Sequence, residues 1–389
     1  MNIGLFGFGC VGQGLWDVLH RTHGLRSRIT RICVKDRTKQ RSLPSEMFTF
    51  DKSDILDDVD LHVVVELIDD ADAAFEIVTT AMRNGKAVVT ANKKMIAQHF
   101  DVLLALQRET GQPLLYEAST GGSIPIIRNL EEYYDNDLLS GVEGIVNGTT
   151  NYILTRLSAD ASKGYADAVA DAQRLGFAES DPTLDVVGWD AAFKTLIIAA
   201  HSMGTVLKPG DVVRRGIETI APFDIKAATA LQRTVKLVSR VRLHDHGFAA
   251  SVLPALIDSS DPLSKVINET NAIRLHGAFA DDQMLIGKGA GAHPTASAVL
   301  SDLAALRYDY RYEYKKLQQG DSPAYSLDVP VKVYVRGPHD VITSTPFTHV
   351  DVEHRTGEGR YVIGTTSLKA LQECAAFHSE ACFVATVDG

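Results

Sequence analysis

The chain has 389 residues, of which 45% are hydrophobic, so it can form two or three domains with real cores. Its 49 acidic residues outnumber 39 basic ones, and the net charge of −10 argues against a nucleic-acid partner, because a phosphate backbone needs a basic surface. The opening residues MNIGLFGFG have no charged n-region or cleavage site, no apolar run reaches membrane-spanning length, and the cysteines have no CxxC spacing. We therefore expect a cytoplasmic protein without membrane contact, disulfide framework or zinc site.

The N-terminal segment predicts a dinucleotide-binding turn. An apolar strand is expected over 2–7, followed by Gly7, Gly9 and Gly12 in GxGxxG spacing and by a helix over 15–23. The glycines let the backbone approach a pyrophosphate, and the helix N-terminus supplies free N–H groups. The alternative is a tight turn that binds nothing. The candidate cofactor contacts in this turn are Gly7, Phe8, Gly9, Cys10, Val11 and Gly12.

The end of the second predicted strand bears on the choice of cofactor. This strand runs over 29–34 and leads into Lys35, Asp36 and Arg37. Asp36 lies where an acid would bind the ribose 2′-hydroxyl of NAD, whereas Lys35, Arg37 and Arg41 could receive the 2′-phosphate of NADP. The sequence leaves the preference between NAD and NADP open.

Further alternation of strands and helices predicts a doubly wound parallel sheet of the Rossmann type. We expect strands over 61–68, 87–91 and 113–118, and helices over 71–84 and 95–109. Lys93 follows one of these strands and so lies at a carboxyl end of the sheet, where ligands bind in this architecture. The simpler interpretation is a solvated lysine that opens a helix.

A polar turn follows the next strand, which is expected over 140–146. The turn reads NGTTN from Asn147, and Thr150 or Asn151 would make a sound N-cap for the helix that comes after it. The functional alternative is that this turn forms a wall of the substrate pocket.

The stretch from Gly176 to Lys194 is the most informative in the chain. Gly176 ends a helical run over 165–175, and the acids Glu179, Asp181, Asp185 and Asp190 then lead to Lys194 inside an apolar segment. A buried, unpaired ammonium is costly, so these acids are its expected acceptors. Asp190 and Lys194 are four residues apart and share a helix face. A solvated surface pair is the alternative, but the apolar Ile197 and Ile198 continue the same stripe.

The second half of the chain predicts an antiparallel sheet and a small C-terminal module. Segments 224–257 and 272–286 contain alternating and apolar runs, as in a sheet that is covered by helices and offers a dimer surface. A glycine turn over 287–295 enters a helix, and Gly291 is a candidate cofactor contact there. Residues 307–326 read as a polar linker, and 327–389 read as four strands and one helix over 367–378.

Together these motifs resemble a known family, the homoserine dehydrogenases. The resemblance implies oxidation of L-homoserine to L-aspartate 4-semialdehyde, or the reverse, with NAD or NADP, in the biosynthesis of threonine, methionine and isoleucine. It rests on a signature with many fixed positions, which are Ala172, Gly176, Phe177, Ala178, Asp181, Pro182, Asp185, Val186, Gly188, Asp190 and Lys194.

The resemblance also implies roles for single residues. Lys194 resembles the proton donor and acceptor at the substrate hydroxyl. A lysine can act as a base near neutral pH only if burial or a second cation lowers its pKa, and Lys93, in a TANK motif that in the family lies near nicotinamide and substrate, could be that cation. The residues expected to bind substrate are Glu179, Asp185, Asp190 and Thr149, and Asp190 is also a catalytic candidate because it could steady Lys194.

The turn EASTGGSIPII, which begins at Glu117, resembles the family's hinge out of the nucleotide domain. In the family this hinge binds a monovalent cation, sodium, through carbonyl oxygens, which carried over are those of Glu117, Thr120, Gly122 and Ile124. One departure concerns the cofactor contact at Ile68, because the family usually has glycines where this chain has Asp69 and Asp70. Acids that point inward there would repel a phosphate-bearing ligand.

The predicted organisation is a nucleotide-binding domain over 1–130 completed by 287–318, a substrate-binding and dimerisation domain over 131–286, and a C-terminal module over 325–389. This α+β module resembles a shortened regulatory ACT module without a clear second helix, and we expect it to fold as a satellite. The expected assembly is a homodimer or homotetramer. The alternatives are a dehydrogenase of another small hydroxy compound and a non-catalytic nucleotide sensor, although a sensor would not need Asp190 with Lys194.

Overall fold

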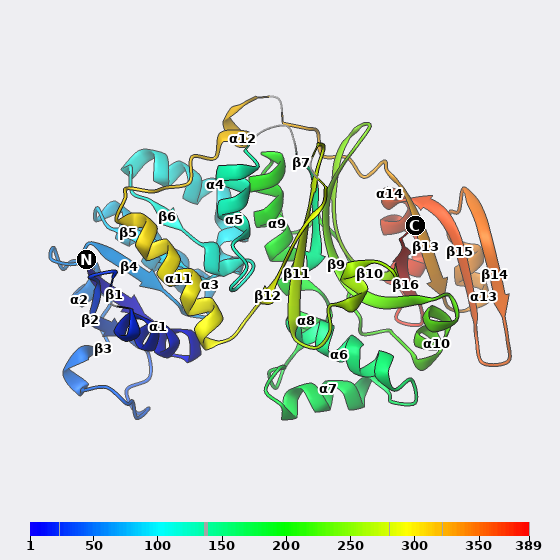
Figure 1. Cartoon of the computed structure of the whole chain (residues 1–389), viewed down its shortest axis with the longest axis horizontal. Helices are drawn as coiled ribbons and strands as arrows, with labels where there is room; N and C mark the ends of the chain where they lie inside the picture. The colour runs from blue at the N-terminus through cyan, green and yellow to red at the C-terminus, as the bar shows by residue number, and fades with distance from the viewer. Residues whose placement is uncertain (23, 136–138, 280, 321, 389) are drawn as a thin grey trace. The chain divides into compact units, whose positions relative to one another are not determined.

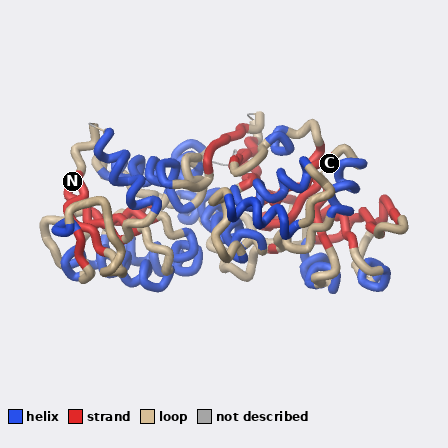
Figure 2. The backbone as a smooth tube through the Cα atoms, turned by 90° about the horizontal axis from the view of Figure 1, so that it is seen from below, coloured by secondary structure: helices blue, strands red, loops and turns tan. Residues whose placement is uncertain are grey.

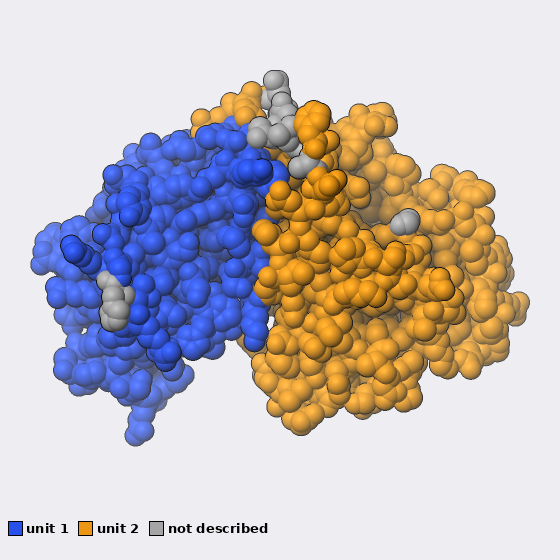
Figure 3. Space-filling model, in the orientation of Figure 1, with its two compact units in different colours: residues 1–135, 288–315 blue, residues 136–287, 316–389 orange. Residues whose placement is uncertain are grey.

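The computed structural model describes residues 1–389 apart from 23, 136–138, 280, 321 and 389. The chain forms two compact units (Figure 3). Unit 1 comprises Met1–Asp135 with Lys288–Lys315, and unit 2 comprises Asn136–Gly287 with Lys316–Gly389. The chain thus leaves unit 1 after Asp135 and returns to it at Lys288.

Unit 1 contains a six-stranded parallel sheet in the order β3-β2-β1-β4-β5-β6, which is the Rossmann order. The register places Phe6 beside Cys33 and Glu66, and Glu66 beside Thr90, so that four neighbouring strands end at the same level. Ligands bind beyond such carboxyl ends. The strands are β1 (Asn2–Phe6), β2 (Arg28–Cys33), β3 (Phe48–Thr49), β4 (Val63–Glu66), β5 (Ala87–Thr90) and β6 (Leu114–Leu115).

Helices lie on both sides of these strands (Figure 2). Helix α1 packs on α11, and α3 packs on α4. A Cβ at Gly14 would lie 2.5 Å from the carbonyl oxygen of Ala292, so only glycine allows this approach of α1 to α11. The helices are α1 (Cys10–Arg21), α2 (Ser53–Leu56), α3 (Ala71–Arg83), α4 (Lys93–Thr110), α5 (Ile126–Arg128) and α11 (Ala292–Leu306), with short turns η1 (Ser45–Met47), η2 (Glu117–Ser119) and η3 (Asn129–Tyr133).

The stretch predicted as a polar linker is partly buried in unit 1. Tyr312 and Tyr314 are 3% and 5% exposed and pack on Tyr116, whose hydroxyl lies 3.1 Å from that of Tyr314. The prediction of a linker over 307–326 was therefore wrong for this part, because alternate tyrosines in a charged sequence place their rings on one side and bury them.

Unit 2 is built on a ten-stranded sheet, whose strands follow the order β12-β11-β7-β9-β10-β16-β13-β15-β14, with β8 beside β10. Pairing is antiparallel where registers are defined, except that β16 and β8 run parallel to β10. The strands are β7 (Leu139–Ile145), β8 (Val213–Arg214), β9 (Arg233–His244), β10 (Gly247–Asp258), β11 (Thr270–Gly277), β12 (Gln283–Lys288), β13 (Pro330–Arg336), β14 (His349–Arg355), β15 (Arg360–Ser367) and β16 (Phe383–Val387).

Helices α6, α9 and α10 pack on strand β9 of this sheet (Figure 1). Part of the stretch predicted as sheet over 224–257 is instead helix α10, which Pro222 opens at a position where proline is favoured. The helices of this part of the chain are α6 (Gly148–Ala159), α7 (Tyr165–Arg174), α8 (Thr183–Val186), α9 (Trp189–Met203), α10 (Pro222–Ala230), α12 (Lys315–Gln318), α13 (His339–Thr343), α14 (Leu368–Glu373) and α15 (Ala375–His378), with the turn η4 (Pro262–Lys265).

The C-terminal residues have the β-α-β-β-α-β order of a ferredoxin-like module, with strands arranged β16-β13-β15-β14. Helix α13 supplies the second helix that the sequence did not reveal. The helix expected over 367–378 is interrupted at Cys374, whose backbone is extended (φ −81°, ψ 152°).

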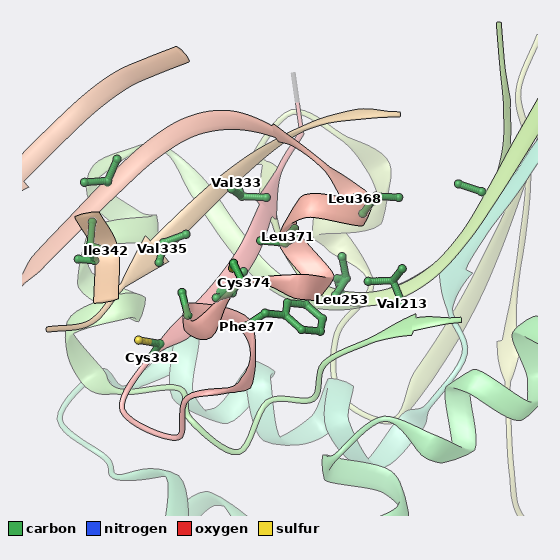
Figure 4. Packing of buried hydrophobic residues seen from close by; sticks show 14 residues of the cluster. Val213, Leu253, Val333, Val335, Ile342, Leu368, Leu371, Cys374, Phe377 and Cys382 are labelled. Atoms are coloured by element: carbon green, nitrogen blue, oxygen red, sulfur yellow. The ribbon is translucent and has the colours of Figure 1, made fainter. Parts of the chain in front are cut away.

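This C-terminal module does not form a third unit, contrary to the expected satellite. Strand β16 pairs with β10 through Ala255 and Leu256, so the sheet is continuous. Figure 4 shows one apolar cluster in which Val213 and Leu253 pack with Val333, Leu371 and Phe377. Within the described part of the chain, none of the helices has the length and apolar character needed to cross a bilayer.

Candidate active site

Helix α9 positions the lysine and acid that the sequence singled out. Gly188 precedes the helix with φ +84°, a left-handed conformation that suits glycine. The Arg214 guanidinium lies 4.0 Å from the centroid of the Trp189 ring and stabilises this first turn. From Asp190 to Met203 every residue of α9 is buried, as expected for a helix that is apolar on all sides.

Lys194 and Asp190 form a buried pair. The Nζ of Lys194 lies 2.8 Å from Oδ2 of Asp190, and the two side chains are only 8% and 11% exposed. Nζ also donates to the carbonyl oxygen of Val146 at 2.7 Å, just beyond the end of β7. The interpretation as a solvated surface pair is therefore wrong. An ammonium has three N–H donors, so these two acceptors leave one N–H for a substrate oxygen.

Asn147 links this pair to a second acid. Its Nδ2 donates to Oδ1 of Asp185 at 2.7 Å and to Oδ2 of Asp190 at 2.8 Å, while its Oδ1 accepts from Thr150 N at 2.8 Å. Asn147 is thus the N-cap of α6, and the predicted caps Thr150 and Asn151 lie inside the helix. The end of β7, the start of α6, α8 and α9 meet at this cluster.

Two further predicted substrate residues lie close to this cluster in sequence. The hydroxyl of Thr149 donates to the carbonyl oxygen of Phe177 at 2.7 Å, which ties α6 to the loop that carries the acids. Glu179 is exposed in that loop, and its carboxylate makes no hydrogen bond or ion pair with the residues that the structure describes. The contacts therefore join Asp185, Asp190 and Lys194 but do not include Glu179.

In unit 1 the turn after β1 is so tight that two of its glycines leave no room for a side chain. A Cβ at Gly7 (φ +91°) would lie 2.6 Å from the carbonyl oxygen of Leu67, and one at Gly12 would lie 2.5 Å from that of Gly7. Gly9 has no atom within 4 Å of its Cβ position, so its outer face is open. Cys10 and Val11 follow in the first turn of α1, where N–H groups lack intrahelical partners. Phe8 is buried and packs on Phe48.

The loop after β2 presents several cations. Lys35 is exposed, and the guanidinium groups of Arg37 and Arg41 lie 4.7 and 5.2 Å from the ring centroids of Phe50 and Phe48. The carboxylate of Asp36 accepts hydrogen bonds from the hydroxyl and the backbone N of Thr38, both at 2.7 Å, and these lower its pKa. Asp36 is thus engaged by its own loop.

Other predicted cofactor contacts lie at the ends of strands and helices. Ile68 is half-buried just beyond β4, and Lys93 is half-buried as the first residue of α4. Gly291 is the N-cap of α11 with φ +118°. Asp69 is exposed, and the carboxylate of Asp70 accepts from Asp72 N and Ala73 N at 3.1 Å as the N-cap of α3. Asp70 therefore caps helix α3.

The hinge residues expected to bind a cation are buried around η2. The carboxylate of Glu117 accepts from Ile127 N and Arg128 N at 2.9 and 2.8 Å, and the carbonyl of Ile124 accepts from Ile126 N. Thr120 is fully buried, and Gly122 has φ +57°. Over the described residues there is no cluster of three or more His, Cys, Asp or Glu side chains suited to a metal. A cation here would need carbonyl ligands.

Comparison with known proteins shows to which family this chain belongs. The family model "Homoserine dehydrogenase" matches residues 125–304, and "Homoserine dehydrogenase, NAD binding domain" matches 7–117. A curated homoserine dehydrogenase of Bacillus subtilis is 39% identical over 320 residues, which cover 80% of this chain and 74% of that protein. The chain belongs to the homoserine dehydrogenase family. It is accordingly an NAD(P)-dependent oxidoreductase.

Solved structures of the family have the same fold. A homoserine dehydrogenase from Thiobacillus denitrificans matches with a TM-score of 0.88 and 27% identity, covering 100% of this chain and 98% of that one. A hyperthermophilic archaeal homoserine dehydrogenase in complex with NADPH matches with a TM-score of 0.68 and 28% identity, covering 80% of this chain and 98% of that one. The predicted family and fold class are confirmed.

Sequence reasoning missed two parts of the cluster around Lys194. One is the carbonyl of Val146, which leaves no side-chain signal. The other is Asn147, whose role as an N-cap could have been found because asparagine is favoured there and follows the predicted strand, although this signal does not reveal its bridge to the acids.

Proposed function

We propose that this member of the family interconverts L-homoserine and L-aspartate 4-semialdehyde, with Lys194 as the group that accepts or donates the proton of the substrate hydroxyl. The supporting observation is the buried Nζ, which Asp190 and the Val146 carbonyl hold while one N–H remains for a substrate oxygen. In the reducing direction the ammonium gives its proton to the oxygen as it gains charge; in oxidation the neutral amine takes that proton back. Bound nicotinamide supplies or accepts the hydride.

The acids near Lys194 would bind the amino acid itself. Asp185 and Asp190 are held side by side by Asn147, and their combined negative charge suits the α-ammonium of homoserine. Glu179, which is exposed on the preceding loop, and the hydroxyl of Thr149 would complete this set. Lys93 would polarise the reacting oxygen as a second cation. In this proposal Lys194 transfers the proton, and the acids bind the substrate.

For the cofactor we propose NADP in preference to NAD, held at the glycine turn, Lys35, Ile68, Lys93 and Gly291. Support comes from the loop after β2, where the Asp36 carboxylate is engaged by Thr38 while Lys35, Arg37 and Arg41 carry positive charge. A 2′-phosphate is better received by cations than a 2′-hydroxyl is. An archaeal member of the family is known in complex with NADPH, which agrees with this choice.

The remaining features belong to the same proposal. A sodium ion would bind through the carbonyl oxygens of Glu117, Thr120, Gly122 and Ile124. The protein would work in the cytoplasm as a homodimer or homotetramer. The edge strand β14 exposes Val350 and Val352, which are 41% and 37% accessible, so a subunit contact there would cover apolar surface. Light scattering of the purified protein measures the assembly.

The deciding experiment follows the absorbance of reduced nicotinamide with L-homoserine, using NAD and NADP in parallel. Turnover with NADP above that with NAD supports both proposals, and turnover with NAD alone contradicts the cofactor preference. Absence of turnover with either, while the cofactor binds, favours the alternative of a nucleotide sensor. Turnover only with another small hydroxy compound would point to a different dehydrogenase. The Lys194→Ala protein serves as the blank.

A further inference from the structure

Four hydrogen bonds form a closed ring at the carboxyl ends of β4 and β5. The carboxylate of Glu66 accepts from Ile68 N at 2.6 Å and from the Thr90 hydroxyl at 2.5 Å, the Thr90 oxygen accepts from Asn92 N at 3.0 Å, and the Asn92 side-chain amide donates to the Ile68 carbonyl at 3.1 Å. The bonds therefore lead from Glu66 through Thr90, Asn92 and Ile68 back to Glu66. Its members come from two different loops, which follow neighbouring strands.

The ring is buried at its base. Glu66 and Thr90 are both 0% exposed, and they stand side by side in the register of β4 and β5. The Thr90 oxygen already accepts the Asn92 N–H, so its own proton points to Glu66. Burial raises the pKa of Glu66 to about 7, yet both of its oxygens have donors. A buried carboxyl group with no charged partner in this ring is costly, and its position at the ligand-binding edge suggests that it is retained for function.

Each loop in the ring carries a residue with a predicted role at the cofactor. Ile68 is itself a member, and its Cγ2 lies 3.2 Å from the Cβ position of Gly7, so Ile68 borders the glycine turn. Lys93 follows Asn92 directly and opens α4, whose N-cap is Asn92. A shift of either loop would therefore move a residue that is expected to contact the cofactor.

We propose that Glu66 is a positioning residue. Through Thr90 and Asn92 it fixes the loop that carries Ile68 against the turn that carries Lys93. This keeps the edge of unit 1 in the conformation that binds the cofactor. The inference rests on the proposed cofactor contacts of Ile68 and Lys93. It makes Glu66 neither a proton donor nor a substrate ligand. Its effect should appear in the dissociation constant of the cofactor, which is measured without homoserine and so does not depend on the proposed reaction.

The test uses Thr90→Val, which keeps the shape of the side chain and removes two bonds of the ring. We expect the dissociation constant of NADPH, followed by its fluorescence, to rise at least about tenfold, since two hydrogen bonds of ordinary strength are lost at the base of the site. Thr90→Ser keeps the hydroxyl and should bind nearly as the natural protein does. Thr79→Val is the matched control, because Thr79 is also buried in unit 1 but its hydroxyl bonds only within α3. It should leave the affinity unchanged.

A second variant keeps the test decisive if Thr90→Val does not fold. Asn92→Ser keeps an N-cap for α4 but is too short to reach the Ile68 carbonyl, and we expect a rise of a few fold in the dissociation constant with little change in Tm. In the double variant with Thr90→Val and Asn92→Ser, the fold rise in the dissociation constant should be smaller than the product of the two single rises, because both substitutions disrupt the same ring. If both single variants bind NADPH as tightly as the natural protein while Tm falls, the ring serves stability alone and the proposal is overturned.

Discussion

The Nζ of Lys194 and Oδ2 of Asp190 lie 2.8 Å apart in a helix whose residues from Asp190 onward are all buried. The same Oδ2 also accepts from Asn147, 2.8 Å away, so one carboxylate oxygen meets both an ammonium and an amide. Two buried opposite charges are better tolerated when other groups hydrogen-bond to them, and here the Val146 carbonyl and Asn147 supply such bonds. The arrangement holds the amino group of Lys194 at a fixed point inside the protein.

Replacing this amine tests its role in proton transfer. Lys194→Ala should lower kcat by about 10² to 10⁴-fold, the usual effect of losing a positioned acid or base, while the dissociation constant of NADPH stays unchanged. Steady-state kinetics and fluorescence titration measure the two quantities. Lys86→Met is the matched control, because Lys86 is also buried but donates to the carbonyls of Asp58 and Leu61 in unit 1; it should lower Tm and keep kcat. An equal loss of cofactor affinity in Lys194→Ala would make Lys194 structural.

Asn147 should matter for both stability and substrate binding, and two substitutions separate these effects. Asn147→Ala removes the cap of α6 and the donor to two acids, so the free energy of unfolding should fall by about 2 kcal/mol and kcat/KM by more than about tenfold. Asn147→Ser restores a cap but cannot reach both carboxylates. We expect it to regain most of the stability, measured by urea unfolding, and little of kcat/KM. Full recovery of kcat/KM by serine would show that the bridge between the acids is unimportant.

Glu179 offers a test of ground-state binding. It is exposed, and its carboxylate has no bond within the described residues, so it is available for the ammonium of the substrate. Glu179→Gln should raise the KM for homoserine with little change in kcat, since the lost charge acts on bound substrate and transition state alike. The neighbouring Asp181→Asn provides a control, because Asp181 is already engaged by Thr183 in its own loop. A defect in kcat alone would contradict this role for Glu179.

Local patterns predicted the nucleotide-binding unit well, because its signals lie in short stretches of sequence. The strand, the glycine turn with Gly7 and the helix after it all require only neighbouring residues, and the burial of Lys194 follows from the apolar helix around it. The bridge from Asn147 to Asp185 joins residues 38 positions apart, and no spacing rule specifies such a contact. The same holds for Tyr312 and Tyr314, whose polar neighbours hide their burial.

The buried carboxyl of Glu66 should make stability depend on pH. Burial raises its pKa from 4.5 to about 7, so the folded protein holds this proton at pH values where the unfolded chain has released it. The free energy of unfolding therefore falls between pH 4.5 and about 7, and the loss stays at about 3 kcal/mol at higher pH. Glu66→Gln cannot ionise, so its stability relative to the natural protein should increase over this range by a similar amount. Urea unfolding at a series of pH values measures this, and a difference that does not change with pH would be evidence against the raised pKa.

The C-terminal strands were expected to form a satellite, but in the structure they continue the sheet of unit 2. The expectation came from a polar linker and about 60 residues with their own alternating pattern, which is typical of a separate module. Pairing between β16 and β10 is parallel and links residues about 130 positions apart, so no local pattern could indicate it. The guanidinium of Arg240 also reaches the C-terminal end, where it pairs with Asp388 and donates to the Thr386 hydroxyl.

Truncation after Gln319 tests how far the catalytic body depends on this module. The cut would remove β16 from β10, expose Val213 and Leu253, and take away the carbonyls of Phe377, Ser379 and Cys382 to which the buried Arg215 donates. A buried cation without its acceptors is strongly destabilising, and an uncovered strand edge favours aggregation.

We therefore expect the truncated chain to be largely insoluble, or to unfold well below the Tm of the full chain, and to lose activity for that reason. The soluble fraction and thermal unfolding measure this outcome. Lys369→Gln is a suitable control, because Lys369 is exposed on α14 within this module, and its replacement should leave solubility and activity intact. A truncated chain that stays soluble with an unchanged Tm would mean that the strands before Gln319 form a complete fold without β16, and that the shared apolar cluster contributes little to it.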